Sequence, residues 1–170
     1  MIKYITYHQL KIARGILNLG VRDIALLLKV NKSTVSNAEQ GKSRDFFFKN
    51  SACLLEFFKK NNIIFPTDYS IRYNQTIVSQ PIVSDLKILT RFQLKSARIL
   101  LSLSQSSLAK QIGVTEGVII RLELFPNNMY ITTKKPLITK KIYELFNFYG
   151  IEFHEGLYVF FKKYMDNTQF

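Results

Sequence analysis

Apolar residues recur at helical spacing in two segments that lie far apart in the chain. Their spacing places them along one side of a helix, which is the pattern of an amphipathic helix that buries one face. These residues are Leu10, Ala13, Ile16 and Leu17 in the first segment and Leu94, Ala97, Leu100 and Leu101 in the second. We therefore predict a short amphipathic helix in each segment.

The two segments belong to one internal repeat. Displacing the sequence by 84 positions aligns residues 9–41 with residues 93–125 without a gap. At a displacement of 88, residues 56–65 align with residues 144–153, so the second copy has four extra residues (88 minus 84) before its last helix. We predict two domains, residues 1–74 and 85–170. The linker at 75–84 has no helical period and contains a proline.

Polar residues predict how the first helix of each copy begins. Thr6 precedes Gln9 by three positions, and Thr90 precedes Gln93 by the same distance. In a capping box the Thr hydroxyl accepts from the third backbone N–H of the helix, while the Gln side chain accepts from the Thr backbone N–H. Both copies are therefore expected to start their first helix directly after this Thr.

Two further helices and a tight turn follow in each copy. The second helices are predicted over residues 21–28 and 105–112. Lys29 and Gly113 then occupy a turn position that favours a left-handed backbone, for which Gly is better suited. The third helices start after the N-caps Asn31 and Thr115 and run to about residues 40 and 124. A short helix, a tight turn and another short helix have the lengths of a helix-turn-helix.

A last helix and a hairpin complete each copy. The last helices are predicted over residues 50–60 and 137–149. Branched and aromatic runs indicate strands at 63–65 and 70–73, and again at 151–153 and 157–160, with turns at 66–68 and 154–156. Because an isolated hairpin is marginally stable, each is expected to pack on helices or to pair with another strand.

The helix-turn-helix segments carry a family resemblance. Residues 105–115, QSSLAKQIGVT, resemble the core motif of Cro/repressor-type (XRE-type) helix-turn-helix proteins. Residues 31–41, NKSTVSNAEQG, resemble the recognition helix of that family and its terminal Gly, and residues 149–153, YGIEF, resemble bacterial members whose fifth helix runs into a strand. The resemblance implies a mostly α protein with two tandem lambda-repressor-like helical bundles, each followed by a short β-hairpin.

The same resemblance implies roles for single residues. An Arg of the first helix pairs with a Glu at the end of the third, and the matching pairs here are Arg14 with Glu39 and Arg98 with Glu123. DNA base contacts fall on Lys32, Ser33 and Asn37 in the first copy and Arg121 in the second, side chains that suit the hydrogen-bonding edges of bases. Backbone phosphate contacts fall on Thr34, Ser36, Lys42, Arg44, Gln105 and Thr115.

The second copy departs from the family pattern in its third helix. Glu116 is repelled by phosphate unless it accepts from cytosine, and Gly117 has no side chain with which to read a base. Ile120 replaces a position that is usually polar, and Leu124 stands near the place of the helix-ending Gly. A basic run that includes Lys134, Lys135, Lys140 and Lys141 offers additional phosphate contacts or a solvated face.

Composition narrows the class of protein. Lys and Arg number 24 against 12 Asp and Glu, a net charge of +12, which favours polyanionic partners. Cys53 is the single cysteine, so no internal disulfide forms, and it lies far in sequence from His8 and His154, unlike a zinc finger. No segment has the length of a membrane span or a signal peptide. We expect a cytoplasmic, nucleoid-associated protein without a cofactor.

These observations predict a transcriptional regulator, repressor-like, that binds double-stranded DNA with its first recognition helix in the major groove. Either the two copies form an internal pseudo-dimer on DNA, or the second copy forms a homodimer and only the first copy contacts bases. The altered third helix of the second copy favours the homodimer. The alternatives are a protein-interaction module on a helix-turn-helix scaffold and an antitoxin-type autoregulator with a protein partner. An enzyme is not expected, because neither His has a partnered nucleophile or carboxylate at suggestive spacing.

Overall fold

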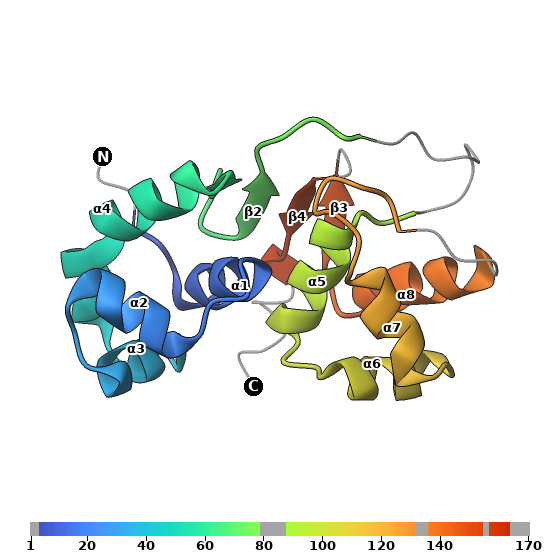
Figure 1. Ribbon diagram of the computed structural model, residues 1–170, viewed down its shortest axis with the longest axis horizontal. Helices are drawn as coiled ribbons and strands as arrows, with labels where there is room; N and C mark the ends of the chain where they lie inside the picture. Colours follow the sequence, from blue (N-terminus) through green and yellow to red (C-terminus); the bar gives the residue numbers. More distant parts are fainter. Residues whose placement is uncertain (1–3, 79–87, 132–135, 155–156, 164–170) are drawn as a thin grey trace.

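A succession of four helices and two strands occurs twice along the chain (Figure 1). The computed structural model describes residues 4–78, 88–131, 136–154 and 157–163, apart from the side chain of Arg44. The first half contains α1 (Tyr7–Ile16), α2 (Val21–Leu28), α3 (Lys32–Glu39), α4 (Arg44–Lys60), β1 (Ile63–Ile64) and β2 (Ser70–Tyr73). The second contains α5 (Arg91–Leu100), α6 (Gln105–Ile112), α7 (Glu116–Leu122), α8 (Pro136–Phe148), β3 (Glu152–His154) and β4 (Tyr158–Phe160). The described chain is therefore mostly helical, as predicted.

The predicted helix starts and turns are confirmed where local hydrogen bonding sets them. Both capping boxes are present: the Thr6 hydroxyl accepts from the Gln9 N–H, and the Thr90 hydroxyl from the Gln93 N–H. Lys29 has the left-handed φ of 54° that the turn after α2 requires. The helices α3 and α7 begin directly after Asn31 and Thr115, but neither of these described side chains makes a cap hydrogen bond.

The largest error in a helix boundary concerns α4. It begins at Arg44 and not at residue 50, because Phe46 is buried one turn before Asn50, whose side-chain amide donates to the Phe46 carbonyl at 2.8 Å. Three successive Phe residues, 46–48, hid this start, since they show no helical period. Helix α8 lies within one residue of its predicted range, whereas α3 and α7 end one and two residues early.

The four strands form one sheet and not two separate hairpins. Its strand order is β1-β2-β4-β3, with antiparallel pairing between β1 and β2, between β3 and β4, and between β2 and β4. The central β2–β4 pair joins the two halves of the chain. The predicted turn at 66–68 lies within the described chain, and residues 155–156 of the other turn lie outside it.

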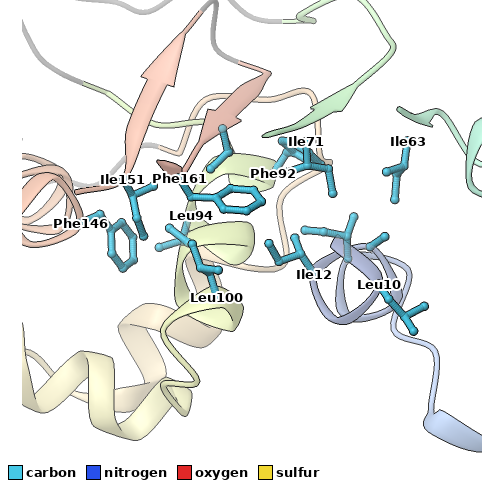
Figure 2. Packing of buried hydrophobic residues seen from close by; sticks show 14 of the residues in the cluster. Leu10, Ile12, Ile63, Ile71, Phe92, Leu94, Leu100, Phe146, Ile151 and Phe161 are labelled. Atoms are coloured by element: carbon cyan, nitrogen blue, oxygen red, sulfur yellow. The ribbon is translucent and has the colours of Figure 1, made fainter. Parts of the chain in front are cut away.

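Helices α1 and α5, the first helices of the two copies, pack against each other in the middle of the molecule (Figure 1). Gly15 permits this close approach, because a Cβ at this position would lie 2.5 Å from Cδ1 of Ile99. Buried residues of both halves belong to one hydrophobic cluster, and Figure 2 shows Ile12 of α1 and Leu100 of α5 within it, together with Ile71 of the sheet. The two predicted domains thus share a core.

The described part of the connection between the halves, residues 74–78, contacts the second half. The backbone N–H of Val78 donates to the Asn128 carbonyl at 3.1 Å, and the Asn128 side chain donates to the Thr76 carbonyl at 2.8 Å. Residues 79–84 of the predicted linker lie outside the described chain.

Candidate nucleic-acid interface

Helix α3 separates its side chains into a buried and an outward face. Val35 and Ala38 are buried, whereas Lys32, Ser33 and Asn37 are exposed. The three predicted base-contacting residues of the first half are thus accessible on a helix of eight residues. Helix α2 packs against α3, and the turn at residues 29–31 joins the two helices. This packing sets the direction in which the exposed face of α3 points.

An ion pair anchors the end of α3 to α1. Nε of Arg14 donates to Oε1 of Glu39 at 2.7 Å and Nη2 donates to Oε2 at 2.9 Å, while Nη1 donates to the Leu19 carbonyl at 2.7 Å. Glu39 exposes only 9% of its side chain. The predicted pair is therefore present, and its two parallel hydrogen bonds orient α3 as well as holding it.

The second half repeats this anchor and adds a third group to it. Arg98 donates to both carboxylate oxygens of Glu123 and to the Leu103 carbonyl. Nε2 of Gln105 also donates to Oε2 of Glu123 at 3.0 Å. Gln105, predicted to contact phosphate, is half-buried and engaged with this ion pair. Its equivalent in the first half is Val21, which makes no such bond.

The remaining predicted phosphate-contacting residues lie around α3 and at the start of α7. Thr34 and Ser36 are half-buried on α3, and Lys42 is exposed in the connection to α4. Arg44 is the first residue of α4, and its side chain lies outside the described part of the structure. Thr115 is exposed at the N-cap of α7. The structure thus brings Thr34, Ser36 and Lys42 near the outward face of α3, and places Thr115 in the other half.

Basic side chains predominate along α2, α3 and the connections that flank them. Those described as exposed are Arg22, Lys29, Lys32 and Lys42. The same stretch contains one exposed carboxylate, Asp23, which accepts from the Gly20 backbone N–H at 2.6 Å. The local charge therefore has the sign that attracts phosphate.

Helix α7 has different side chains at the positions equivalent to the outward residues of α3. Glu116, Gly117, Ile120 and Arg121 are all exposed, and Nε of Arg121 donates to the Gly117 carbonyl at 3.2 Å within the same helix. Arg121, the predicted base-contacting residue of this half, is accessible. Lys140 and Lys141 are exposed on α8, and Lys134 and Lys135 lie outside the described chain.

Two buried basic residues of α5 were missed by the sequence analysis. Nε of Arg91 donates to the Glu123 carbonyl at 3.2 Å, and the guanidinium also bonds the Asn127 side chain. Nζ of Lys95 donates to Oδ1 of Asn18 across the boundary between the halves. Burial, together with the nearby charge of Arg91, lowers the pKa of Lys95 to about 8. The identical pair Lys11/Lys95 in the repeat was the available signal, and its meaning depends on the packing of α1 against α5.

The pairs α2–α3 and α6–α7 lie toward the two ends of the molecule, and both lie on the side away from the sheet (Figure 1). Within the described ranges, no three His, Cys, Asp or Glu side chains come together as a metal site would require. The helices of the described chain also lack the combination of length and apolar character needed to cross a membrane. Comparison with known proteins yields no match among family models, curated proteins or solved structures.

Proposed function

We propose that this chain is a sequence-specific double-stranded DNA-binding regulator with two tandem Cro/repressor-type helix-turn-helix bundles, and that α3 enters the major groove. One observation carries the proposal: α3 exposes Lys32, Ser33 and Asn37 on one face while a bidentate ion pair holds its end to α1. A rigidly held helix with polar residues facing outward is what direct reading of base edges requires.

The outward side chains match the groups that bases present in the major groove. Lys32 has an ammonium group that donates to O6 and N7 of guanine, and Asn37 has an amide that pairs with N6 and N7 of adenine. Ser33 donates or accepts with either base. The hydroxyls of Thr34 and Ser36 and the ammonium of Lys42 are then positioned for phosphates, which set the register of the protein on the duplex.

The net charge of +12 supplies the general attraction to a duplex. Phosphate neutralisation by Lys and Arg releases counterions, so the affinity falls as salt rises. The choice of DNA sequence then depends on the few side chains of α3 that reach base edges, whereas the affinity depends on the larger number of Lys and Arg side chains that contact phosphates.

Binding to DNA selected from a random pool tests the proposal. The Asn37→Ala variant is expected to accept any base at one position of the selected site, with an affinity loss of about 1–3 kcal/mol for the selected base. Lys32→Ala is expected to weaken binding as well. Matched controls are Asn147→Ala and Lys59→Ala, which change exposed residues of α8 and α4 and should bind as the wild type does. If no sequence is enriched at any salt concentration, the proposal is wrong.

Exposed apolar side chains in the second half favour protein binding as a second candidate function. Phe148 is 81% exposed, Leu124 76% and Leu137 61%. Large apolar side chains that remain exposed can contribute to a protein-interaction surface. In this alternative the chain enriches no DNA sequence in the experiment above. A protein partner that co-purifies with the wild type should then be lost from the variant in which Leu124, Leu137 and Phe148 are all changed to Ser.

A further inference from the structure

The two halves contact each other as the subunits of a two-fold symmetric dimer do. In such an interface the same patch occurs on both sides, and each contact has a reciprocal counterpart. Lys11 Nζ donates to the Ser102 hydroxyl at 2.6 Å, and Lys95 Nζ donates to the Asn18 side chain. Lys95 is the equivalent of Lys11 and Ser102 is the equivalent of Asn18, each 84 residues later, so the repeat converts the Lys11–Ser102 contact into the Lys95–Asn18 contact.

The sheet obeys the same relation at the displacement of 88. Ser70 of β2 pairs with Phe160 of β4, and Arg72 pairs with Tyr158. Because Tyr158 is the equivalent of Ser70, and Phe160 that of Arg72, the strands pair as two copies of one strand related by a two-fold axis. The side chains of Gln9 and Gln93 confirm the equivalence, since they donate to the carbonyls of Ser70 and Tyr158, respectively.

These contacts occupy the matching surfaces of both halves within one chain. The paired edges of β2 and β4 and the facing sides of α1 and α5 are not available for the same contacts with a second chain. A pseudo-two-fold axis also relates α3 to α7, which lie toward opposite ends of the molecule and away from the sheet (Figure 1). Two reading helices related in this way face one duplex in opposite orientations.

The geometry points to a single chain that binds one bipartite DNA site, composed of two inverted half-sites with different sequences. This inference rests on the proposed function and identifies the class of DNA that the site would take. The internal axis predicts inverted half-sites for one chain, and symmetric helix-turn-helix dimers bind half-sites about one helical turn, ~34 Å, apart.

The half-sites differ because α3 and α7 differ in the side chains that would meet the DNA. Lys32, Ser33, Ser36 and Asn37 of α3 correspond to Glu116, Gly117, Ile120 and Arg121 of α7. Arg121 donates to guanine, and the exposed Ile120 suits the methyl group of thymine. Glu116 accepts only from cytosine and is repelled by phosphate, and Gly117 offers no side chain. The α3 half-site is therefore the stronger one.

Selection of duplexes from a random pool by the full chain tests this inference. We expect two unlike motifs in inverted orientation with centres ~10 base pairs apart, and sedimentation of the complex should give one chain per duplex. Arg121→Ala is expected to relax selection in the second motif alone and to lower affinity for the intact site about tenfold, whereas Asn37→Ala relaxes only the first. Lys59→Ala, an exposed change in α4, should leave both motifs intact.

Three outcomes would overturn the inference, and they can be told apart. A single enriched half-site that depends on Asn37 but not on Arg121 leaves the proposed function in place and refutes the second reading helix. Two chains on one duplex refute the internal pairing of half-sites. No enriched sequence at all refutes both proposals together.

Discussion

Ile71 of β2 lies directly opposite Val159 of β4, and the two residues occupy the same position in the two copies of the repeat, 88 apart. Gly15 and Ile99, which meet between α1 and α5, are likewise equivalent, 84 apart. A residue contacts its own equivalent only near a two-fold axis. The pseudo-axis therefore passes close to both contacts, one in the sheet and one between the helices.

Side-chain volume at Gly15 should control the packing of α1 against α5. Gly15→Val places carbon atoms where Ile99 already lies, and we expect the free energy of unfolding to fall by about 1–3 kcal/mol in urea titrations. Gly117→Ala is the matched control, because its added Cβ meets no atom within 4 Å. That variant should gain roughly 0.5–1 kcal/mol from helix propensity.

A double-mutant cycle isolates the contact from other effects of the substitution. Ile99→Ala makes room beside position 15, so Gly15→Val should cost less in that background than in the wild type. Equal costs in both backgrounds would show that α1 and α5 do not meet through these residues.

Removing the carboxylate of Glu39 should destabilise the first half strongly. Glu39→Ala leaves the guanidinium of Arg14, 19% exposed, without its bidentate partner, and the expected loss is about 3 kcal/mol by chemical denaturation. Glu56→Ala removes the exposed i,i+4 partner of Lys60 and should leave the denaturation midpoint unchanged. A small effect at Glu39 would contradict its role as the anchor of α3.

Lys95 should make stability depend on alkaline pH. Its pKa is lowered to about 8 by burial and by the charge of Arg91, so between pH 8 and about 10.5 the unfolded chain binds more protons at this residue than the folded chain does. The contribution of Lys95 to the free energy of unfolding therefore rises with pH across this window. Lys95→Met should flatten the rise, and Lys11→Met, at the equivalent position, should retain it. Parallel pH profiles for wild type and Lys95→Met would contradict this prediction.

His8 should make stability depend on acidic pH. Burial, assisted by the charge of Lys11, lowers its pKa to about 4, and its ring lies 3.9 Å from that of Tyr7. Between pH 6.5 and 4 the unfolded chain binds more protons, so the contribution of His8 is present above this window and is lost as the pH falls through it. His8→Phe should reduce the acid sensitivity of thermal unfolding, whereas His154→Phe, at an exposed position, should not. Equal acid sensitivity of wild type and His8→Phe would refute the assignment.

Local and repeated features were predictable. The bonds between Thr6 and Gln9 span three residues, and Lys29 has a left-handed backbone at the turn position where such a residue was predicted. The ion pair between Arg14 and Glu39 followed from a family resemblance, and its spacing of 25 residues recurs in the second copy. The outward position of Asn37 was likewise implied by the family resemblance, and in the structure Asn37 is exposed while Val35 and Ala38 are buried.

Other features depended on contacts between distant segments. The early start of α4 depends on a buried site for Phe46, and the engagement of Gln105 depends on where Glu123 lies. The buried amine of Lys95 has a polar partner, Asn18, that lies 77 residues away. None of these partners can be read from the local period of the chain.

By itself the sequence determined most of the helices, the capping boxes at Thr6 and Thr90 and the repeat, since these depend on hydrogen bonds within a few residues or on a pattern present twice. The tertiary structure alone decided that Ile71 would pair with Val159 and that Gly15 would meet Ile99. An apolar stripe shows that a face is buried and an unpaired strand edge shows that a partner is needed, but neither identifies the partner. That choice depends on how the two halves fit together, and here each half completes the other.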